Sequence, residues 1–274
     1  MPTQAYAREA TVATASVFTK LTGTFDGGTA DDIITPAKAK SIQRITVGVG
    51  LDGAAAADGT VIVRLRGSGM TKGIQDIAVC GTGSEGTPVT YDQVNVTLPV
   101  SMPVQSGDII IEGCYSGADS GTPELSVGLV FSDKPGTASY QTREAQTGTA
   151  DTWTTLSGDG TATGVNEIRA SGSRIVQAFH AVGPSATTQE PCGFAMRLQG
   201  IGGSMAGGDA EHTYVGPSMA AADGTVTAVK LCPSLMHDMD IPVVKGGQVR
   251  IQAVASGGAV TGTPEQAVTL VFVD

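Results

Sequence analysis

The chain has 274 residues, of which 41% are apolar, and it carries a formal net charge of −10 at neutral pH. Such a length and apolar content suffice for two buried cores, and the negative charge argues against direct electrostatic binding of nucleic acid. No apolar run reaches membrane-spanning length, and the first residues lack the basic and apolar regions of a secretory signal, so we expect synthesis in the cytoplasm without a signal peptide.

Alternating segments rich in β-branched residues dominate the chain, and turns rich in Gly, Asp, Ser and Pro separate them. In the first half they predict strands at residues 11–24, 41–50, 60–67, 75–80, 89–100, 108–115 and 124–131. In the second half they predict strands at residues 141–148, 174–182, 193–199, 211–215, 225–231, 248–254 and 266–273. Since no segment longer than a turn or two has a convincing helical period, we expect an all-β protein of sandwich or jelly-roll type.

The two halves repeat each other. The pattern G-T-P-E-x-x-V-x-L-V-F-x-D occurs at residues 121–133 and again at residues 262–274, where it ends the chain. At matching positions upstream, Arg64-Leu65 corresponds to Arg197-Leu198, and residues 8–10 read Arg-Glu-Ala like residues 143–145. This predicts a tandem duplication of two antiparallel, jelly-roll-like β-sandwich domains, residues 1–136 and residues 137–274.

The sequence has only weak matches to motifs for catalysis, nucleotide binding or metal binding. Residues 81–86 match G-x-G-x-x-G, but a strand pattern follows them, whereas a nucleotide site needs a helix there. Of the histidines His180, His212 and His237, the last two have carboxylates beside them, which suits a metal site but is equally typical of solvated turns. We therefore predict no catalytic residue, no cofactor and no metal site, and leave calcium binding at Asp-Gly turns such as Asp26-Gly27 open.

The cysteines Cys80, Cys114, Cys192 and Cys232 do not fall at equivalent positions in the two halves. A disulfide framework inherited through duplication would keep such equivalence. We expect buried thiols in strands.

Arg64 and Arg197 are the most informative charged residues, because each stands between apolar neighbours at the same strand position of its half. A structural partner is one interpretation, with Glu124 for Arg64 and the equivalent Glu265 for Arg197. A role at an interface is the other.

Two tandem sandwich units with a surface rich in Gly, Ala and Thr and no catalytic constellation resemble the viral double jelly-roll major capsid proteins. In that family two eight-stranded units of one chain stand side by side, and trimers form pseudo-hexagonal tiles. Phage decoration, spike and baseplate proteins built from tandem sandwiches are similar too. The resemblance implies a structural protein of the virion that assembles with itself as a homotrimer within a larger shell, together with other virion proteins.

Two other functions are weighed against this one. A tandem binding module for carbohydrate or a cell surface would need an exposed aromatic platform, and the sequence has one tryptophan, Trp153, with aromatic residues at 4%. An enzyme would need a recognisable site, which tandem sandwiches of this kind lack. We therefore expect no enzymatic activity.

Overall fold

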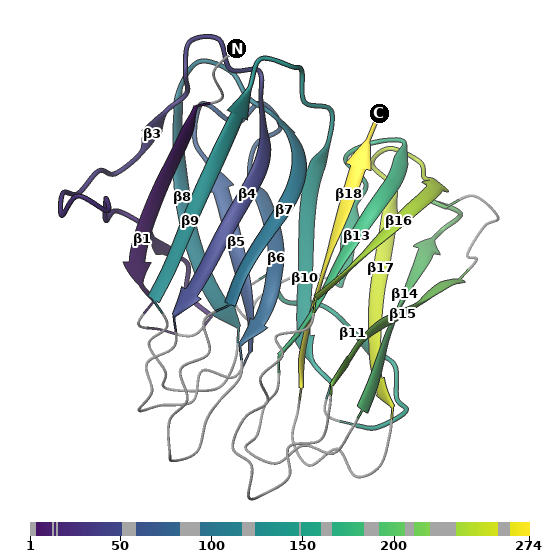
Figure 1. The fold of residues 1–274 in the computed structure, drawn as a ribbon. Coiled ribbons are helices and arrows are strands. Elements are labelled where there is room, and N and C mark those ends of the chain that lie inside the picture. The colour runs from purple at the N-terminus through teal and green to yellow at the C-terminus, as the bar shows by residue number, and fades with distance from the viewer. Residues whose placement is uncertain are drawn as a thin grey trace, which may run out of the picture.

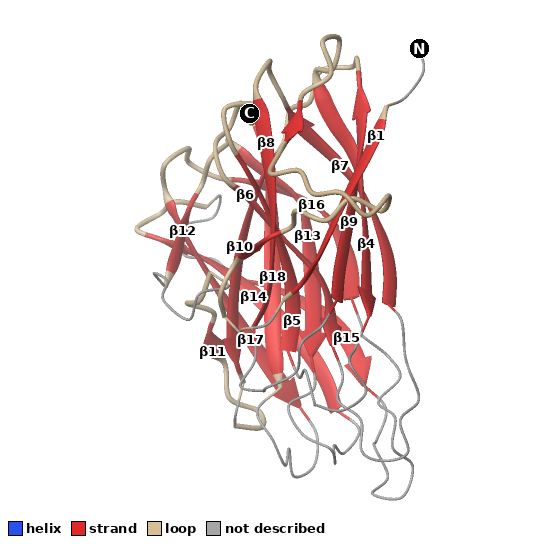
Figure 2. Cartoon of the chain, turned by 90° about the vertical axis from the view of Figure 1, so that its left-hand side faces the viewer, coloured by secondary structure: helices blue, strands red, loops and turns tan. Residues whose placement is uncertain are grey.

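The computed structural model describes residues 4–12, 14, 16–50, 59–82, 94–116, 124–147, 149–159, 166–183, 192–205, 211–219, 234–256 and 264–274. Every regular element in these residues is a strand, so the all-β class is confirmed (Figure 2). The strands form two units that stand side by side, which we call unit 1 (β1–β9) and unit 2 (β10–β18) (Figure 1).

Unit 1 is a sandwich of two antiparallel sheets. One sheet has the strand order β1-β9-β4-β7, and the other has the order β2-β8-β5-β6, with the short β3 paired to β8. The strands are β1 (Ala5–Thr11), β2 (Thr19–Lys20), β3 (Ile33–Ile34), β4 (Ser41–Gly50), β5 (Gly59–Arg66), β6 (Gln75–Thr82), β7 (Val94–Pro103), β8 (Asp108–Ser116) and β9 (Glu124–Ser132).

Unit 2 repeats this topology strand for strand. Its sheets have the orders β10-β18-β13-β16 and β11-β17-β14-β15, with β12 paired to β17. The strands are β10 (Ser139–Gln146), β11 (Thr154–Thr155), β12 (Glu167–Arg169), β13 (Arg174–Gly183), β14 (Cys192–Ile201), β15 (Glu211–Met219), β16 (Ser234–Pro242), β17 (Gln248–Ser256) and β18 (Glu265–Val273). The duplicated jelly-roll-like sandwich is thus confirmed. The boundary at residue 136 lies between β9 and β10, and as a domain boundary it stays a prediction.

One predicted strand and one predicted turn are wrong. The predicted strand at residues 11–24 is wrong, because the N-terminal strand is β1 (Ala5–Thr11), which pairs along its whole length with the distant β9. The turn predicted around His237 is also wrong, because β16 contains this residue and pairs with β13. The strand predicted at residues 225–231 lies outside the described residues, as do residues 89–93 of the strand that precedes Val100.

The two repeats of the shared motif differ in how they are covered. In β9 buried and partly exposed residues alternate, as expected for a strand with one face on the core. In β18 the residues from Glu265 to Phe272 are all buried. Since β9 and β18 hold the same place in their sheets, an additional layer must cover the outer face of β18, and that layer belongs to unit 1.

Candidate functional site

The outer face of β18 is covered by β6, the edge strand of unit 1. Strand β6 contacts β13, β10 and β18 of unit 2. The backbone N–H of Ala78 donates to Thr269 Oγ1 at 2.7 Å, and Thr142 Oγ1 donates to the Asp76 carbonyl at 2.8 Å. An edge strand exposes unpaired backbone groups, and at this junction hydroxyls of the neighbouring sheet bond to two of them.

Apolar side chains continue the core of unit 1 across the junction. Tyr140 and Phe179 of unit 2 stack with ring centroids 6.5 Å apart, and both pack in the buried cluster of unit 1. A second cluster joins Ala78 to Ala181 and Ala267. Burial raises the pKa of Tyr140 to about 12, against the effect of its hydrogen bond with Ser101. Because dense packing resists sliding, the two units hold a fixed orientation.

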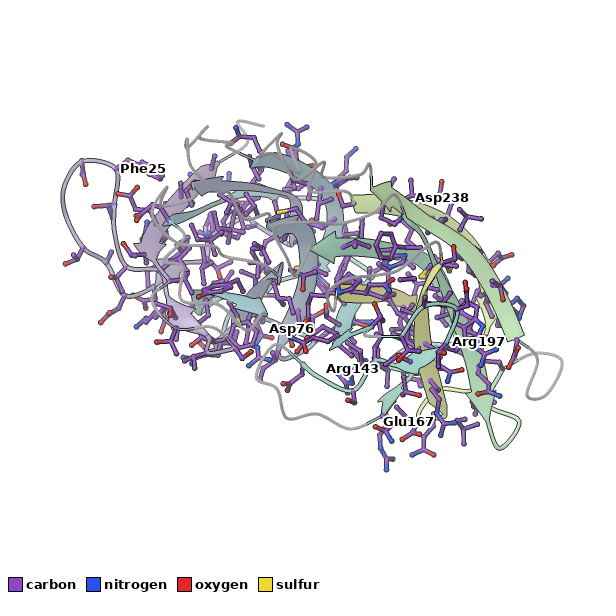
Figure 3. All side chains as sticks on the ribbon, turned by 90° about the horizontal axis from the view of Figure 1, so that it is seen from below. Phe25, Asp76, Arg143, Glu167, Arg197 and Asp238 are labelled. Atoms are coloured by element: carbon purple, nitrogen blue, oxygen red, sulfur yellow. The ribbon has the colours of Figure 1, made fainter. Side chains whose placement is uncertain are left out.

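Arg64 lies at this junction. Its Nε and Nη2 donate to the two carboxylate oxygens of Asp76 at 2.7 and 2.9 Å, and its guanidinium carbon lies 3.7 Å from the ring centroid of Phe18. Nη2 also reaches the carbonyl of Asp159 in unit 2 at 3.5 Å. Burial lowers the pKa of Arg64, but the hydrogen bonds and charge of Asp76 outweigh this and raise it. Figure 3 places Asp76 between the units.

Arg197 repeats this arrangement on the side of unit 2 that lies away from unit 1 (Figure 3). Its guanidinium carbon lies 4.5 Å from the ring centroid of Trp153. Its Nε donates to Gln252 Oε1 at 2.7 Å, and its Nη1 donates to Glu211 Oε2 at 3.2 Å. The stacked cation is therefore common to both units, whereas the acidic partner differs.

The predicted pairing of Arg64 with Glu124 is wrong. Glu124 begins β9, in the sheet opposite the one that holds Arg64, and its Oε2 accepts a hydrogen bond from Thr11 Oγ1 at 2.7 Å. Glu265 begins β18 and is buried, while Arg197 bonds to Gln252 and Glu211. Equivalence in the repeat placed each arginine correctly on its strand but did not identify its partner.

A polar cluster in the core of unit 2 replaces an apolar one in unit 1. His180 is fully buried, and its Nε2 lies 2.9 Å from Gln266 Oε1. Gln266 in turn donates to Thr147 at 2.8 Å. The equivalent positions in unit 1 hold Val12, Val47 and Leu125, all of them buried.

Burial lowers the pKa of His180 to about 4, with a further contribution from His237, while the bond to Gln266 opposes the change. The His180 Nδ1 has no hydrogen-bond partner among the described residues. His237 lies 5.5 Å from Tyr214, measured between ring centroids. No cluster of three or more metal-ligating side chains occurs in the part of the chain that the structure describes.

The remaining motifs hold local structure. Asp26 accepts hydrogen bonds from Thr24 at 2.5 Å and from the Gly28 N–H at 3.3 Å, as in an ordinary turn. Cys80 and Cys114 are buried thiols, and burial raises the pKa of Cys114 to about 12. The Gly-rich segment from residue 83 to 86 and Cys232 lie outside the described residues.

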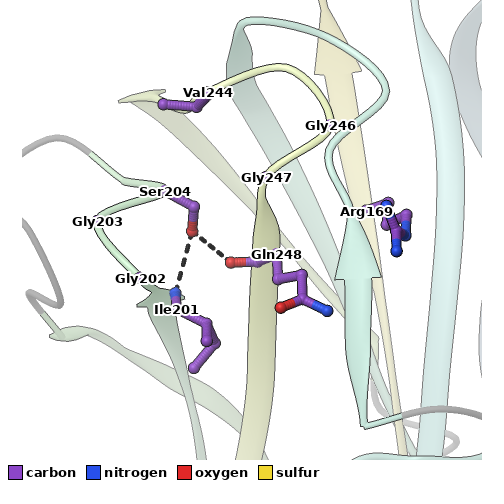
Figure 4. A pocket seen from close by; sticks show the side chains of 9 residues that line it. All are labelled: Arg169, Ile201, Gly202, Gly203, Ser204, Val244, Gly246, Gly247 and Gln248. Atoms are coloured by element: carbon purple, nitrogen blue, oxygen red, sulfur yellow. Dashed lines mark hydrogen bonds between the residues drawn. The ribbon is translucent and has the colours of Figure 1, made fainter.

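A cavity of about 370 Å³ opens between two turns of unit 2 and the end of β12 (Figure 4). Ser204 Oγ accepts from the Ile201 N–H at 3.0 Å and donates to the Gln248 carbonyl. Among the described residues that line the cavity, Arg169 is the one charged side chain. The cavity therefore offers no pair of acid and base for catalysis.

Over the described residues, no helix could span a membrane.

Comparison with known proteins gives likeness of architecture alone. Neither a protein-family model nor a curated protein matches the sequence. The major capsid protein P2 of bacteriophage PM2 is 9% identical with a TM-score of 0.38, and the match covers 100% of this chain and 98% of P2. PNGF-II is 10% identical with a TM-score of 0.46 over 98% of this chain and 66% of its own. A protein of Broad Bean Stain Virus is 7% identical with a TM-score of 0.40 over 98% and 88%. Viral capsid proteins are thus among the solved structures that this chain resembles.

Proposed function

We propose that this chain is a structural protein that assembles with itself, as a component of a viral capsid or virion surface. Its partners are further copies of the chain, and three copies would place six jelly-roll units in one ring. Other virion proteins and localisation to the virion belong to the same proposal, as does the lack of enzymatic activity.

The observation that carries the proposal is the asymmetric junction between the units. The edge strand β6 of unit 1 packs on the outer sheet face of unit 2, so the two units use different surfaces for one contact. Because unit 2 repeats the topology of unit 1, the chain still has one more edge of the β6 type, on β15, and one more outer face, on the sheet of β9. Contacts between different surfaces build rings or filaments from identical copies.

The binding-module alternative finds less support. Trp153 lies under the guanidinium of Arg197 at 4.5 Å, so its ring face is occupied. Among the described aromatic side chains, Phe25 is 64% and Tyr6 is 37% exposed, and they lie on different segments, a loop and β1. A sugar-binding surface usually needs several aromatic rings presented together, and the described residues offer no such platform.

The test is the mass of the purified chain in solution, measured by light scattering behind a sizing column over a wide concentration range and followed by negative-stain imaging. Trimers, or regular sheets and shells, are the expected result. A chain that remains monomeric at the highest concentration would refute self-assembly and make the binding module the better hypothesis.

A further inference from the structure

Val215 is the counterpart in unit 2 of Ala78, which forms the centre of the junction. In unit 1 Ala78 pairs with Ile62 of β5, and in unit 2 Val215 pairs with Ala195 of β14. Ile62 and Ala195 stand at equivalent places, two residues before Arg64 and Arg197. Ala78 is 1% exposed, whereas Val215 is 74% exposed. The edge that unit 1 buries is therefore open in unit 2, with a larger apolar side chain at its centre.

The sheet face of unit 2 on which Ala78 packs, here called the receiving face, also has a counterpart in unit 1. In unit 2 it is formed by Ala181, Ala267 and Thr269, which contact Ala78. The strand registers of β4 and β9 place Gly48, Ser126 and Gly128 of unit 1 at the same positions. All three are partly exposed and uncharged.

The two open surfaces match in size. Across the existing junction an alanine of β6 meets two alanines. Across a second junction of the same geometry, Val215 would meet Gly48, Ser126 and Gly128. The edge side chain is then larger than Ala78, and the receiving face is smaller because Gly128 stands where unit 2 has Thr269. A larger side chain on one side of a packed contact needs space on the other, and here Gly128 supplies it in place of Thr269, since among the described residues nothing lies nearer than 3.8 Å to a Cβ built there.

Gly50, at the C-terminal end of β4, supports the same contact. In unit 2, Gly183 lies so close to the Gly59 carbonyl of unit 1 that a Cβ would overlap it. For its counterpart Gly50, the nearest described atom to a Cβ built there is Cβ of Glu124, at 3.6 Å. None of the described residues of the same chain requires glycine at Gly50, but a neighbouring backbone packed like Gly59 would require it.

The loop that follows β2 is a third part of the surface that would contact a second copy. Asp159 accepts from Arg64 across the junction, and the bridges of Gly23 to Glu9 and of Gly158 to Glu144 place Thr24 at the position equivalent to Asp159. Next to Thr24 stands Phe25, which is 64% exposed. Figure 3 shows Phe25 and Arg197 at opposite ends of the molecule. In a head-to-tail contact the Arg197 of one copy would face this loop of the next.

We infer that the β15 edge of one copy, centred on Val215, docks on the outer face of the β1-β9-β4-β7 sheet of a second copy, between Gly48 and Gly128. This rests on the proposed self-assembly and specifies its interface. The partner is a second copy of this chain, because the chain's own junction supplies the geometry and both halves of the contact are present once per copy.

The test uses two variants that each disable one surface. Val215→Arg places a charge on the open edge, and Gly128→Arg places one on the receiving face, where a Cβ meets nothing nearer than 3.8 Å and the fold is expected to tolerate it. Each variant is expected to need at least about tenfold more protein for half-assembly than the wild type, since an unpaired charge in a contact weakens binding by at least that factor. An equimolar mixture is expected to form a dimer and nothing larger, because one working contact remains.

A matched control is Val244→Arg, which alters a 59% exposed valine in the turn before β17, away from both surfaces, and is expected to assemble like the wild type. Circular dichroism and melting curves establish that the variants fold. If the wild type assembles and the two charged variants assemble equally well, or if their mixture stays monomeric, this interface is wrong while self-assembly stands. A wild type that never assembles overturns the proposed function and this interface together.

Discussion

The polar cluster around His180 makes unit 2 sensitive to acid. The pKa of His180 is lowered from 6.5 to about 4 in the folded chain because the ring is buried. Between these values the unfolded chain binds the proton more tightly, so stability is complete above pH 6.5 and falls as the pH approaches 4. Since one pKa unit corresponds to about 1.4 kcal/mol, the loss is about 3 kcal/mol.

The matched variant copies the apolar core of unit 1 into unit 2. Replacing Thr147, His180 and Gln266 together by Val, Val and Leu introduces the residues that unit 1 carries at Val12, Val47 and Leu125. Because the whole hydrogen-bonded set is removed, no polar group of the three is left unsatisfied. The triple variant is expected to lose about 3 kcal/mol less than the wild type between pH 6.5 and 4.

Urea unfolding at pH 7, 5.5 and 4 measures this difference, with the fluorescence of Trp153 reporting on unit 2. Surface carboxylates titrate in both proteins and cancel in the comparison. If the stability of the wild type and of the triple variant falls in parallel with pH, the burial of a neutral His180 does not control acid stability and the reasoning is refuted. A single His180→Val variant would be less clear, since it leaves the Gln266 amide buried with one partner fewer.

Three further outcomes follow from the junction and the cores. Gly183→Ala is expected to destabilise the dilute chain by about 2 kcal/mol, because the added Cβ overlaps the backbone of unit 1. Gly50→Ala should change the stability little, as melting curves of both variants can measure. Equal losses of stability in the two variants would contradict the close approach at Gly183. Arg64→Met is expected to cost about 3 kcal/mol in urea unfolding because it leaves a buried carboxylate unpaired, against about 1 kcal/mol for Arg197→Met at a more exposed pair. Cys114, whose pKa is raised to about 12, should resist thiol labelling at pH 8 until the chain unfolds, as peptide mass spectrometry can measure, and rapid labelling of the native chain would contradict its burial.

The strands predicted best from the sequence are the central ones, because their apolar residues face the core and make the sequence pattern clear. The repeated motif predicted β9 and β18, and the matching arginines predicted β5 and β14, because these central strands are rich in apolar and β-branched residues. The prediction failed at β1 and β16, which lie at sheet edges. Strand β16 has mostly exposed side chains, and pairing with β13 holds it in place. Local patterns carry little information about such non-local pairing.

The candidate site could be located but not completed from the sequence. Arg64 and Arg197 were identified by their equivalence, and the interface interpretation of Arg64 agrees with its contact to Asp159. Their partners were missed because a carboxylate on the adjacent strand, such as Asp76, is not distinguishable by spacing from one on the opposite sheet. One usable signal was present, since Phe18 and Trp153 stand at equivalent places in the two halves and lie under the two guanidinium groups.

The covered outer sheet face of unit 2 and the open outer sheet face of unit 1 differ in the size of their side chains. The difference is the one expected between a permanent contact and a reversible contact. Unit 2 carries Tyr140 and Phe179 on its covered face, where unit 1 has the much smaller Ala5 and Thr46 on its open face. A junction within one chain never has to be exposed to water, so it can be as apolar as a core. A face that is in water until another copy arrives has small side chains at the centre of the contact, and the charge of −10 keeps free copies apart. One duplicated fold thereby provides a fixed contact inside the chain and an open contact of the same geometry outside it.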